Sequence, residues 1–326
     1  MRRVVTALAL SSVALSACGG GKAITSPTSA GSTSTTAAAP IVQPLLCTKV
    51  SSAATTHPVY IAKIPNTASV QYGLGSADFV YEELVEGGIT RLGAFYYSTL
   101  PSKAGPIRST RLTDIALAKP LNAQIVTSGG APPTIQGVQA AGITLIGQGA
   151  PHVYRVNSGI YGVMADIRGM GADAHQPSAT PKPLLPCGVF KGAGSATNIS
   201  VTFSGSSTTR WSYAGGQYTM TNGIMAPGDV FHPNTIIVVK VDTTDAGYRD
   251  PAGNYVPRSE FRGTGKAIIF SGGKLLIATW HKSSDDSTPT FTDGKGRPVY
   301  INPGRTMLEM IPSGNDPQVP AGHVTY

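Results

Sequence analysis

The chain has 326 residues and a formal net charge of +8, from 25 basic and 17 acidic side chains. Only 13 % of its residues are charged, about half the usual share of roughly 25 %, and 41 % are hydrophobic. This composition excludes a charge-rich disordered protein, and no apolar run is long enough to predict a membrane-spanning helix. The 39 glycines and 25 prolines favour a fold rich in strands and loops.

Residues 1–17 have the pattern of a secretory signal peptide. Two arginines precede a short, mostly apolar stretch, residues 4–15, and the cleavage region Ser16-Ala17-Cys18 follows it. This ending resembles the lipobox of bacterial lipoproteins, in which the cysteine becomes the acylated first residue. Cleavage after Ala17 with a chance cysteine is the alternative. The sequence therefore predicts a lipoprotein that carries palmitate or similar acyl chains on Cys18 and is anchored to the extracytoplasmic face of the cell membrane.

Residues 18–46 have the composition of a flexible tether, because they are mostly Gly, Ser, Thr, Ala and Pro. Cys47 follows this segment, and Cys187 lies in a proline-rich stretch. Acylation of Cys18 leaves these two cysteines in an oxidising compartment, which predicts a disulfide between them. Two separate buried thiols are the alternative.

Residues 47–190 alternate between predicted strands and helices, as in an α/β domain. Strands are expected at residues 58–64, 78–84, 89–98, 124–127 and 144–146, and helices at 109–119 and 133–141. The glycine-containing turn at 86–88 predicts a hairpin between the second and third strands, although a helix from Glu82 is the competing interpretation. Ser109 is the predicted N-cap of the first helix, and Pro120 ends it.

A proline- and glycine-rich interval, residues 177–198, marks the predicted domain boundary. Beyond it, residues 198–326 contain short strands separated by glycine turns, which predicts a small sandwich or barrel. Those strands are expected at 199–203, 210–213, 217–221, 235–241, 267–270, 274–280, 298–301 and 307–311. The predicted fold class is therefore α+β, with an N-terminal α/β domain followed by a mainly antiparallel β domain.

Acidic and basic residues are unevenly distributed. Four acids, Asp78, Glu82, Glu83 and Glu86, lie close together, whereas residues 87–211 hold ten basic and three acidic side chains. Asp78, Glu82 and Glu86 have a spacing that places them on one face of either a strand or a helix. Paired carboxylates can serve acid–base chemistry, but partners for nearby arginines are the favoured interpretation.

Arg91, Arg108 and Arg111 bracket the most basic part of the chain. If Ser109 begins a helix, arginine forks beside its free N–H groups form a site for phosphate or carboxylate. Ordinary ion pairing is the alternative, with Arg91 bound to Glu82 or Glu86 and Arg111 bound to Asp114. The spacing alone does not decide between them.

Other motifs are weaker. His152 and His175 lie near acidic residues, but a metal site needs about three converging ligands, and no zinc-type spacing is present, so no metal is expected. Gly129-Gly130 follows a predicted strand, yet no dinucleotide or Walker pattern occurs, and no cofactor is expected. A serine-hydrolase elbow is not supported. Trp211 and Trp280 are expected in the core. The export signal argues against a nucleic-acid partner.

Two blocks, residues 76–91 (SADFVYEELVEGGITR) and 105–111 (GPIRSTR), resemble the YerB-like family of bacterial lipoproteins. Further similar positions are Gly129-Gly130, Ala150-Pro151-His152, Gly265, Thr279-Trp280-His281-Lys282 and Asn302-Pro303-Gly304. The resemblance spans residues 57–312 and implies a membrane-tethered protein with a domain of unknown function and a C-terminal partner domain. It points to a site made of Asp78, Tyr81, Glu82, Glu86, Arg91, Arg108, Arg111 and His152. Val153 and Met307 depart from the family pattern.

The combined expectation is an envelope lipoprotein that binds an anionic wall precursor or polymer. Arg91, Arg108 and Arg111, with Ser109, would hold a phosphate or carboxylate. Asp78, Glu82 and Glu86 would orient the arginines. One alternative is a hydrolase or transferase on the same ligand, with Glu82, Glu86 or His152 in the catalytic role. Another is a structural partner of a second envelope protein, whose identity the sequence does not indicate.

Overall fold

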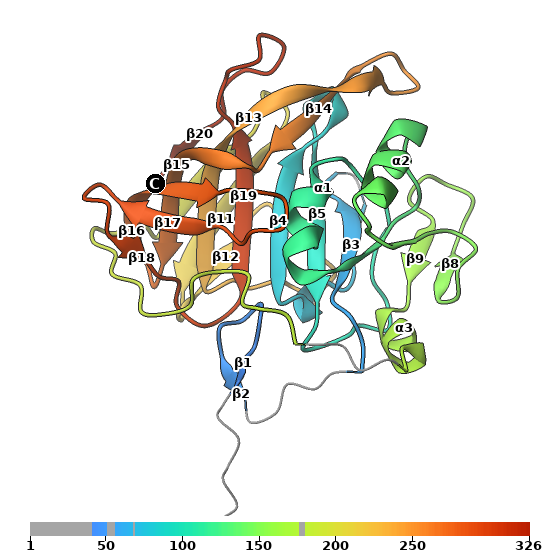
Figure 1. Ribbon diagram of the computed structural model, residues 1–326, viewed down its shortest axis with the longest axis horizontal. Helices are drawn as coiled ribbons and strands as arrows, with labels where there is room; N and C mark the ends of the chain where they lie inside the picture. The colour runs from blue at the N-terminus through green and yellow to red at the C-terminus, as the bar shows by residue number, and fades with distance from the viewer. Residues whose placement is uncertain (1–40, 51–55, 68, 176–179) are drawn as a thin grey trace, which may run out of the picture. The chain divides into compact units, whose positions relative to one another are not determined.

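A large mixed sheet of twelve strands runs through both halves of the sequence (Figure 1). Its strands, from one edge to the other, are β18 (Pro298–Val299), β17 (Thr290–Asp293), β16 (Lys274–Lys282), β15 (Gly263–Ser271), β13 (Thr235–Arg249), β19 (Thr306–Pro312), β4 (Phe79–Leu84), β5 (Thr90–Tyr96), β3 (Tyr60–Pro65), β6 (Gln124–Val126) and β7 (Leu145–Ile146), with β14 (Tyr255–Glu260) paired to β13. Strand β19 pairs in parallel with both β13 and β4. Strands from residues 47–190 and 198–326 therefore belong to one hydrogen-bonded sheet.

The computed structural model describes residues 41–50, 56–67, 69–175 and 180–326, all within one compact unit. The predicted signal peptide, Cys18 and residues 18–40 of the predicted tether lie outside the described residues. Across the described part of the chain, no helix combines the length and apolar character needed to cross a membrane.

A second, four-stranded sheet covers part of one face of the large sheet. Its strands are β12 (Gln217–Met220), β11 (Thr208–Ala214), β10 (Asn198–Thr202) and β20 (His323–Thr325), in that order. Trp211, Val201 and Phe203 pack there against Val80 and Ile236 of the large sheet. Alternate residues of each strand point to opposite faces, so the large sheet carries a separate core on each side.

The second core lies on the other face, where short helices pack (Figure 1). The helical elements of the chain are α1 (Asp114–Ala118), α2 (Pro132–Ala140), α3 (Ile167–Asp173), and the 3₁₀ turns η1 (Leu74–Ser76), η2 (Glu86–Gly88) and η3 (Lys119–Leu121). Small hairpins are formed by β1 (Ile41–Val42) with β2 (Lys49–Val50), and by β8 (Val153–Arg155) with β9 (Val163–Ala165). The fold is mostly β with few helices, and the predicted N-terminal α/β organisation is not clearly present.

Several local predictions are confirmed. β4 and β5 form the predicted hairpin around η2, which rules out a helix from Glu82. Trp211 and Trp280 are both buried. The predicted helix at 109–119 is wrong in its start, because α1 begins only at Asp114. Residues 108–110 instead make backbone hydrogen bonds to Lys63 and Gly129, so tertiary contacts override the local preference for an N-cap at Ser109.

One contact explains why residue 265 is a glycine and residue 280 is a tryptophan. The indole Nε1 of Trp280 donates a hydrogen bond to the Lys240 carbonyl oxygen at 2.9 Å. A Cβ at position 265 would lie 2.6 Å from that oxygen and 2.6 Å from Nε1. Only glycine leaves room for the indole to reach β13 where the pairing of β13 passes from β15 to β14.

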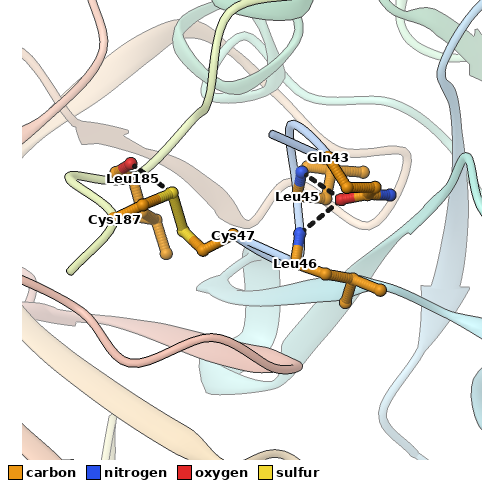
Figure 2. Close-up of a disulfide and its surroundings, with 6 residues drawn as sticks. All are labelled: Gln43, Leu45, Leu46, Cys47, Leu185 and Cys187. Atoms are coloured by element: carbon orange, nitrogen blue, oxygen red, sulfur yellow. Dashed lines mark hydrogen bonds between the residues drawn. A yellow bond between two sulfur atoms is a disulfide. The ribbon is translucent and has the colours of Figure 1, made fainter. Parts of the chain in front are cut away.

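A disulfide joins Cys47 to Cys187, with 5.2 Å between their Cα atoms (Figure 2). Gln43 shapes the preceding turn, because its Oε1 accepts hydrogen bonds from the backbone N–H groups of Leu45 and Leu46 at 2.7 and 2.5 Å. The bond therefore attaches the segment after the predicted tether to the interval between the two halves of the sequence.

Candidate functional site

A fully buried charge network lies between the large sheet, at β3 and β4, and helix α1. Lys63 of β3, Glu83 of β4 and Asp114 of α1 have side chains that are 0 % exposed. The Lys63 Nζ donates to Glu83 Oε1 at 2.7 Å, to Asp114 Oδ1 at 2.7 Å and to Tyr81 Oη at 2.8 Å. All three protons of the ammonium group therefore have an acceptor.

The acids of this network differ in their ionisation. Burial opposes the charge on Asp114, but Lys63 and three hydrogen bonds outweigh it and lower the pKa of that carboxyl group. Burial raises the pKa of Glu83 to about 7, although Lys63 partly offsets this effect. Burial and the nearby acids raise the pKa of Tyr81 well above its ordinary value. Lys63 and Asp114 are thus the principal ion pair.

An arginine layer lies next to this network. Arg91, which is 3 % exposed, places Nη2 3.5 Å from Glu86 Oε1 and donates from Nη1 to the Ser109 carbonyl at 2.7 Å. Arg111 donates from Nε to Glu86 Oε2 at 3.1 Å and from Nη2 to Oε1 of the same carboxylate. Of the two pairings considered for Arg91, the structure shows the one with Glu86. Asp114 accepts the backbone N–H of Arg111 instead of its guanidinium.

Glu86 forms ion pairs with two arginines, and these pairs determine its ionisation. Burial opposes its ionisation, but Arg111 and Arg91 lower its pKa to about 2. The carboxylate is therefore ionised throughout the physiological range and is a weak base. It is suited to positioning arginines.

Arg108 lies further out, and its side chain is half-buried. It donates from Nη1 to the Ile160 carbonyl at 2.8 Å, and its guanidinium carbon lies 5.3 Å from the centre of the Tyr161 ring. Backbone hydrogen bonds join this segment to the loop that follows β6: Ser128 N–H to the Arg108 oxygen, and Thr110 N–H to the Gly129 oxygen.

We call the strip formed by Arg108, Ser109, Arg111 and residues 127–130 the arginine edge. It lies where β6 ends, beside β3 and β7, which run parallel to β6. Ligands of α/β sheets commonly bind outside the carboxyl ends of parallel strands. Helix α2 begins nearby, but Pro132 and Pro133 lack N–H groups, so this edge relies on side chains for donors.

The other predicted acids lie elsewhere. Asp78 Oδ2 accepts the backbone N–H groups of Tyr97 and Ser98 at 2.8 and 2.7 Å and so fixes the end of β5. Glu82 lies between the two sheets, where Thr209 and Asn66 donate to it at 2.9 and 2.8 Å. The expected common face of Asp78, Glu82 and Glu86 is not formed. Strand β4 ends before Glu86, and alternation points Glu82 away from the face that carries Arg91.

Glu309 is a second carboxyl group between the sheets, paired in register with Glu82 across β19 and β4. Trp211 Nε1 donates to its Oε1 at 2.5 Å, and Oε2 has no hydrogen-bond partner among the described residues. Burial, followed by the charge of Glu82, raises the pKa of Glu309 well above its ordinary value. Glu309 forms no ion pair with a basic residue among those that the structure describes, so its surroundings favour the neutral acid.

Glu309→Gln is therefore expected to change how stability depends on pH. A raised pKa in the folded state adds stability that is complete below the ordinary glutamate pKa and is lost as the pH rises through the folded pKa. Above about pH 5, the free energy of unfolding of the wild type should fall relative to the variant by up to about 1.4 kcal/mol per pH unit. Urea unfolding over a pH series measures this difference.

The exposed Asp286→Asn variant serves as the control for that series, since its carboxyl group is 70 % exposed. Parallel pH profiles for wild type and Glu309→Gln would contradict the expectation.

His152 belongs to a different region. Its backbone has a φ of 67°, and its Nε2 lies 2.8 Å from Asp173 Oδ2. It lines a cavity of about 860 Å³ with Tyr60, Gln124 and His175. Tyr60 and Gln124 begin β3 and β6, whereas the arginine edge lies where β6 ends. The three site arginines do not line this cavity. Within the described ranges, no group of three or more His, Cys, Asp or Glu side chains is placed to hold a metal.

Lys63, Glu83 and Asp114 were not predicted as site residues. The signal available for Lys63 is its position in a strand whose six residues are all buried. A lysine is almost never fully buried without a partner, so an acidic partner was to be expected. The sequence does not show which acid fills that role.

Comparisons with known proteins agree with the resemblance noted in the sequence. Residues 47–175 match the family described as "Protein of unknown function (DUF3048) N-terminal domain", and residues 199–308 match its C-terminal domain. The chain is 40 % identical over 65 residues to the "Putative lipoprotein YerB" of Bacillus subtilis (strain 168). That alignment spans 20 % of each chain, so the chain covers about a fifth of that relative's length.

The fold is similar to the crystal structure of the YerB protein from Bacillus subtilis, with a TM-score of 0.69 and 19 % sequence identity. The similarity covers 88 % of this chain and 100 % of that one. Both matched domains, the local identity and the shared fold lead to one conclusion: this chain belongs to the YerB-like family of proteins of unknown function.

Proposed function

We propose that this protein is a lipid-anchored protein on the extracytoplasmic face of the cell membrane that binds an anionic envelope ligand at the arginine edge. The anchoring rests on the signal pattern ending at Cys18 and on the description of the relative as a lipoprotein. The ligand would be a phosphate or carboxylate group of a wall precursor or polymer.

The observation that carries the binding proposal is a surplus of positive charge. Arg91 and Arg111 share a single carboxylate, Glu86, and Arg108 forms no ion pair with any described residue, whereas Lys63 is matched by acids in the buried network. Arg108 is the outermost of the three and would contact the anion. Buried Arg111 and Arg91 would strengthen the local positive field, and Glu86 would hold Arg111 in place.

A binding role has more support than the hydrolase or transferase alternative. Glu86, with a pKa of about 2, is a poor general base. Glu82 is buried between the sheets on the opposite side from the arginine edge. His152 lines a separate cavity. None of the three predicted catalytic candidates therefore combines basicity with access to the proposed anion.

Arg108→Ala is expected to weaken retention of the full chain on purified sacculi that carry their anionic polymers. A charge-assisted hydrogen bond contributes about 1.5–3 kcal/mol, which corresponds to a loss of roughly tenfold or more in affinity. The dependence of retention on salt should become shallower, because one ionic contact is lost. A salt-titrated pull-down measures both quantities. Arg108 is the residue of choice because its removal leaves the Glu86 pairs intact.

Arg297→Ala is the matched control, since Arg297 is exposed and pairs with Asp293 on the β17–β18 hairpin. It should bind like the wild type. Equal retention of Arg108→Ala and wild type at every salt concentration would overturn the proposal. Release of soluble wall fragments by the wild type alone would instead support the enzyme alternative.

A further inference from the structure

The four-stranded sheet leaves a strip of the large sheet uncovered. Its edge strand β20 pairs with β10 and with no other strand in the described part of the chain. Beside β20, the large sheet forms an apolar groove of about 440 Å³. The aliphatic residues that line it include Val238, Ile268, Ile277, Ile311 and Val324. Ile277 is 62 % exposed, which is unusual for an isoleucine in the middle of a nine-residue strand.

Along its strands, the lining of the groove changes from aliphatic to basic side chains. Val238 on β13 is paired with Ile268 on β15, so the two side chains share one level of the sheet. Two residues further along each strand, on the same face, stand Lys240 and Lys266. Both lysines also line the apolar groove. One end of an aliphatic surface is therefore closed by two ammonium groups.

The same two lysines line a second cavity of about 680 Å³, which is polar. Arg258 and Arg262 add positive charge there, against Asp242 and Glu260. Arg258 is paired with Glu260, at 3.1 Å between Nε and Oε1. Asp242 accepts a hydrogen bond from Ser313 at 2.6 Å.

Three basic residues of this cavity have no acidic partner among the described residues. Lys240, Lys266 and Arg262 form no ion pair with any other residue that the structure describes. Two adjoining cavities thus share a pair of lysines, with an aliphatic surface on one side and unpaired positive charge on the other.

We infer that these cavities form one binding site for an anionic lipid. The acyl chain lies in the aliphatic groove over Ile268 and Ile277, and the phosphate of the head group contacts Lys240 and Lys266. This site is separate from the arginine edge, because its residues lie mainly on β13, β15 and β16, with Ile311 of β19 and Val324 of β20, and none of them belongs to that edge. The inference therefore does not depend on the proposed function.

A groove that is aliphatic at one end and positively charged at the other fits an anionic lipid better than an added peptide strand. β20 offers three residues for backbone pairing, so a strand added to its edge would gain few hydrogen bonds. An amphiphile instead satisfies both halves of the site at once. Its chain removes the exposed isoleucine from water, and its anionic head matches the two lysines.

Binding of dodecyl phosphate below its micelle concentration tests the inference by isothermal titration calorimetry. The protein is the full chain carrying Cys18→Ala, so that it has no acyl chain of its own. Ile277→Asp should weaken binding at least tenfold, because it places a carboxylate in the apolar groove. Lys266→Gln should weaken it several-fold and reduce its sensitivity to salt. Inorganic phosphate should not compete at equal concentration.

Two matched controls lie outside the site. Val156→Asp introduces the same charge at a 58 % exposed apolar residue, and Lys274→Gln removes an exposed lysine from the other end of β16. Both should bind dodecyl phosphate like the parent chain. The losses caused by Ile277→Asp and Lys266→Gln should be the same when they are measured in an Arg108→Ala background, which separates this site from the arginine edge. Thermal unfolding checks that each variant is folded.

Three results would each overturn the inference: no saturable binding of dodecyl phosphate, unchanged affinity in both Ile277→Asp and Lys266→Gln, or equal affinity for inorganic phosphate. The last result would indicate an anion site with no place for an acyl chain. Displacement of dodecyl phosphate by an extended peptide but not by other amphiphiles would likewise assign the groove to a protein partner.

Discussion

Lys63→Met is expected to destabilise the fold by about 3–5 kcal/mol, the usual cost of leaving a buried charge without its partner. The substitution removes the only basic side chain hydrogen-bonded to Asp114 and Glu83 in the described network. Methionine fills a similar volume, so the loss reports on charge and not on a cavity. Denaturant unfolding at neutral pH measures the free energy of unfolding.

The size of this effect should depend on pH in a defined direction. Lowering the pH protonates the orphaned carboxylates, so the deficit of Lys63→Met should shrink in acid. The double variant Lys63→Met/Asp114→Asn should lose less stability than the sum of the two single variants, because the uncompensated charge is gone. Lys274→Met, at an exposed site, is the control. A loss below about 1 kcal/mol for Lys63→Met would show that Asp114 and Glu83 are neutral in the folded protein.

Cys47→Ser/Cys187→Ser is expected to lower the free energy of unfolding by about 2–5 kcal/mol. The two cysteines are 140 residues apart in sequence. A cross-link over so long a loop restricts the unfolded chain strongly, which makes the unfolded state less favourable. Denaturant titration of the full chain under oxidising conditions measures the difference.

Reduction of the wild type supplies an internal control for this prediction. The reduced wild type and the double serine variant should have the same denaturation midpoint, and dithiothreitol should leave the variant unchanged. Identical midpoints for oxidised and reduced wild type would contradict the expected contribution of the bond.

Three arginines that look equivalent in the sequence have different environments in the fold, because two of them form buried ion pairs and the third does not. Arg91, Arg108 and Arg111 lie close together in the sequence. In the folded protein, Glu86 holds Arg91 and Arg111, and only Arg108 stands at the outer surface bonded to a carbonyl oxygen. Arg108 is therefore the single substitution that tests binding without disturbing the underlying ion pairs.

The sequence by itself determined the features that depend on neighbours along the chain. The hairpin of β4 and β5 follows from two β-branched and aromatic runs around Glu86-Gly87-Gly88. The family membership follows from two short blocks in the same region. The predicted burial of both tryptophans required only their size and their place in strands.

Only the tertiary structure decided which distant segments meet. Strand β19 pairs with β4 although more than two hundred residues separate them in sequence, and no local pattern encodes that register. The same long-range pairing places Glu309 beside Glu82, and a separate tertiary contact brings Asp114 to Lys63. A charged group in the protein interior pairs with whichever opposite charge the fold places beside it, wherever that residue lies in the sequence. The role of each acid and arginine therefore depends on tertiary contacts, which cannot be predicted from local propensity or from spacing along the chain.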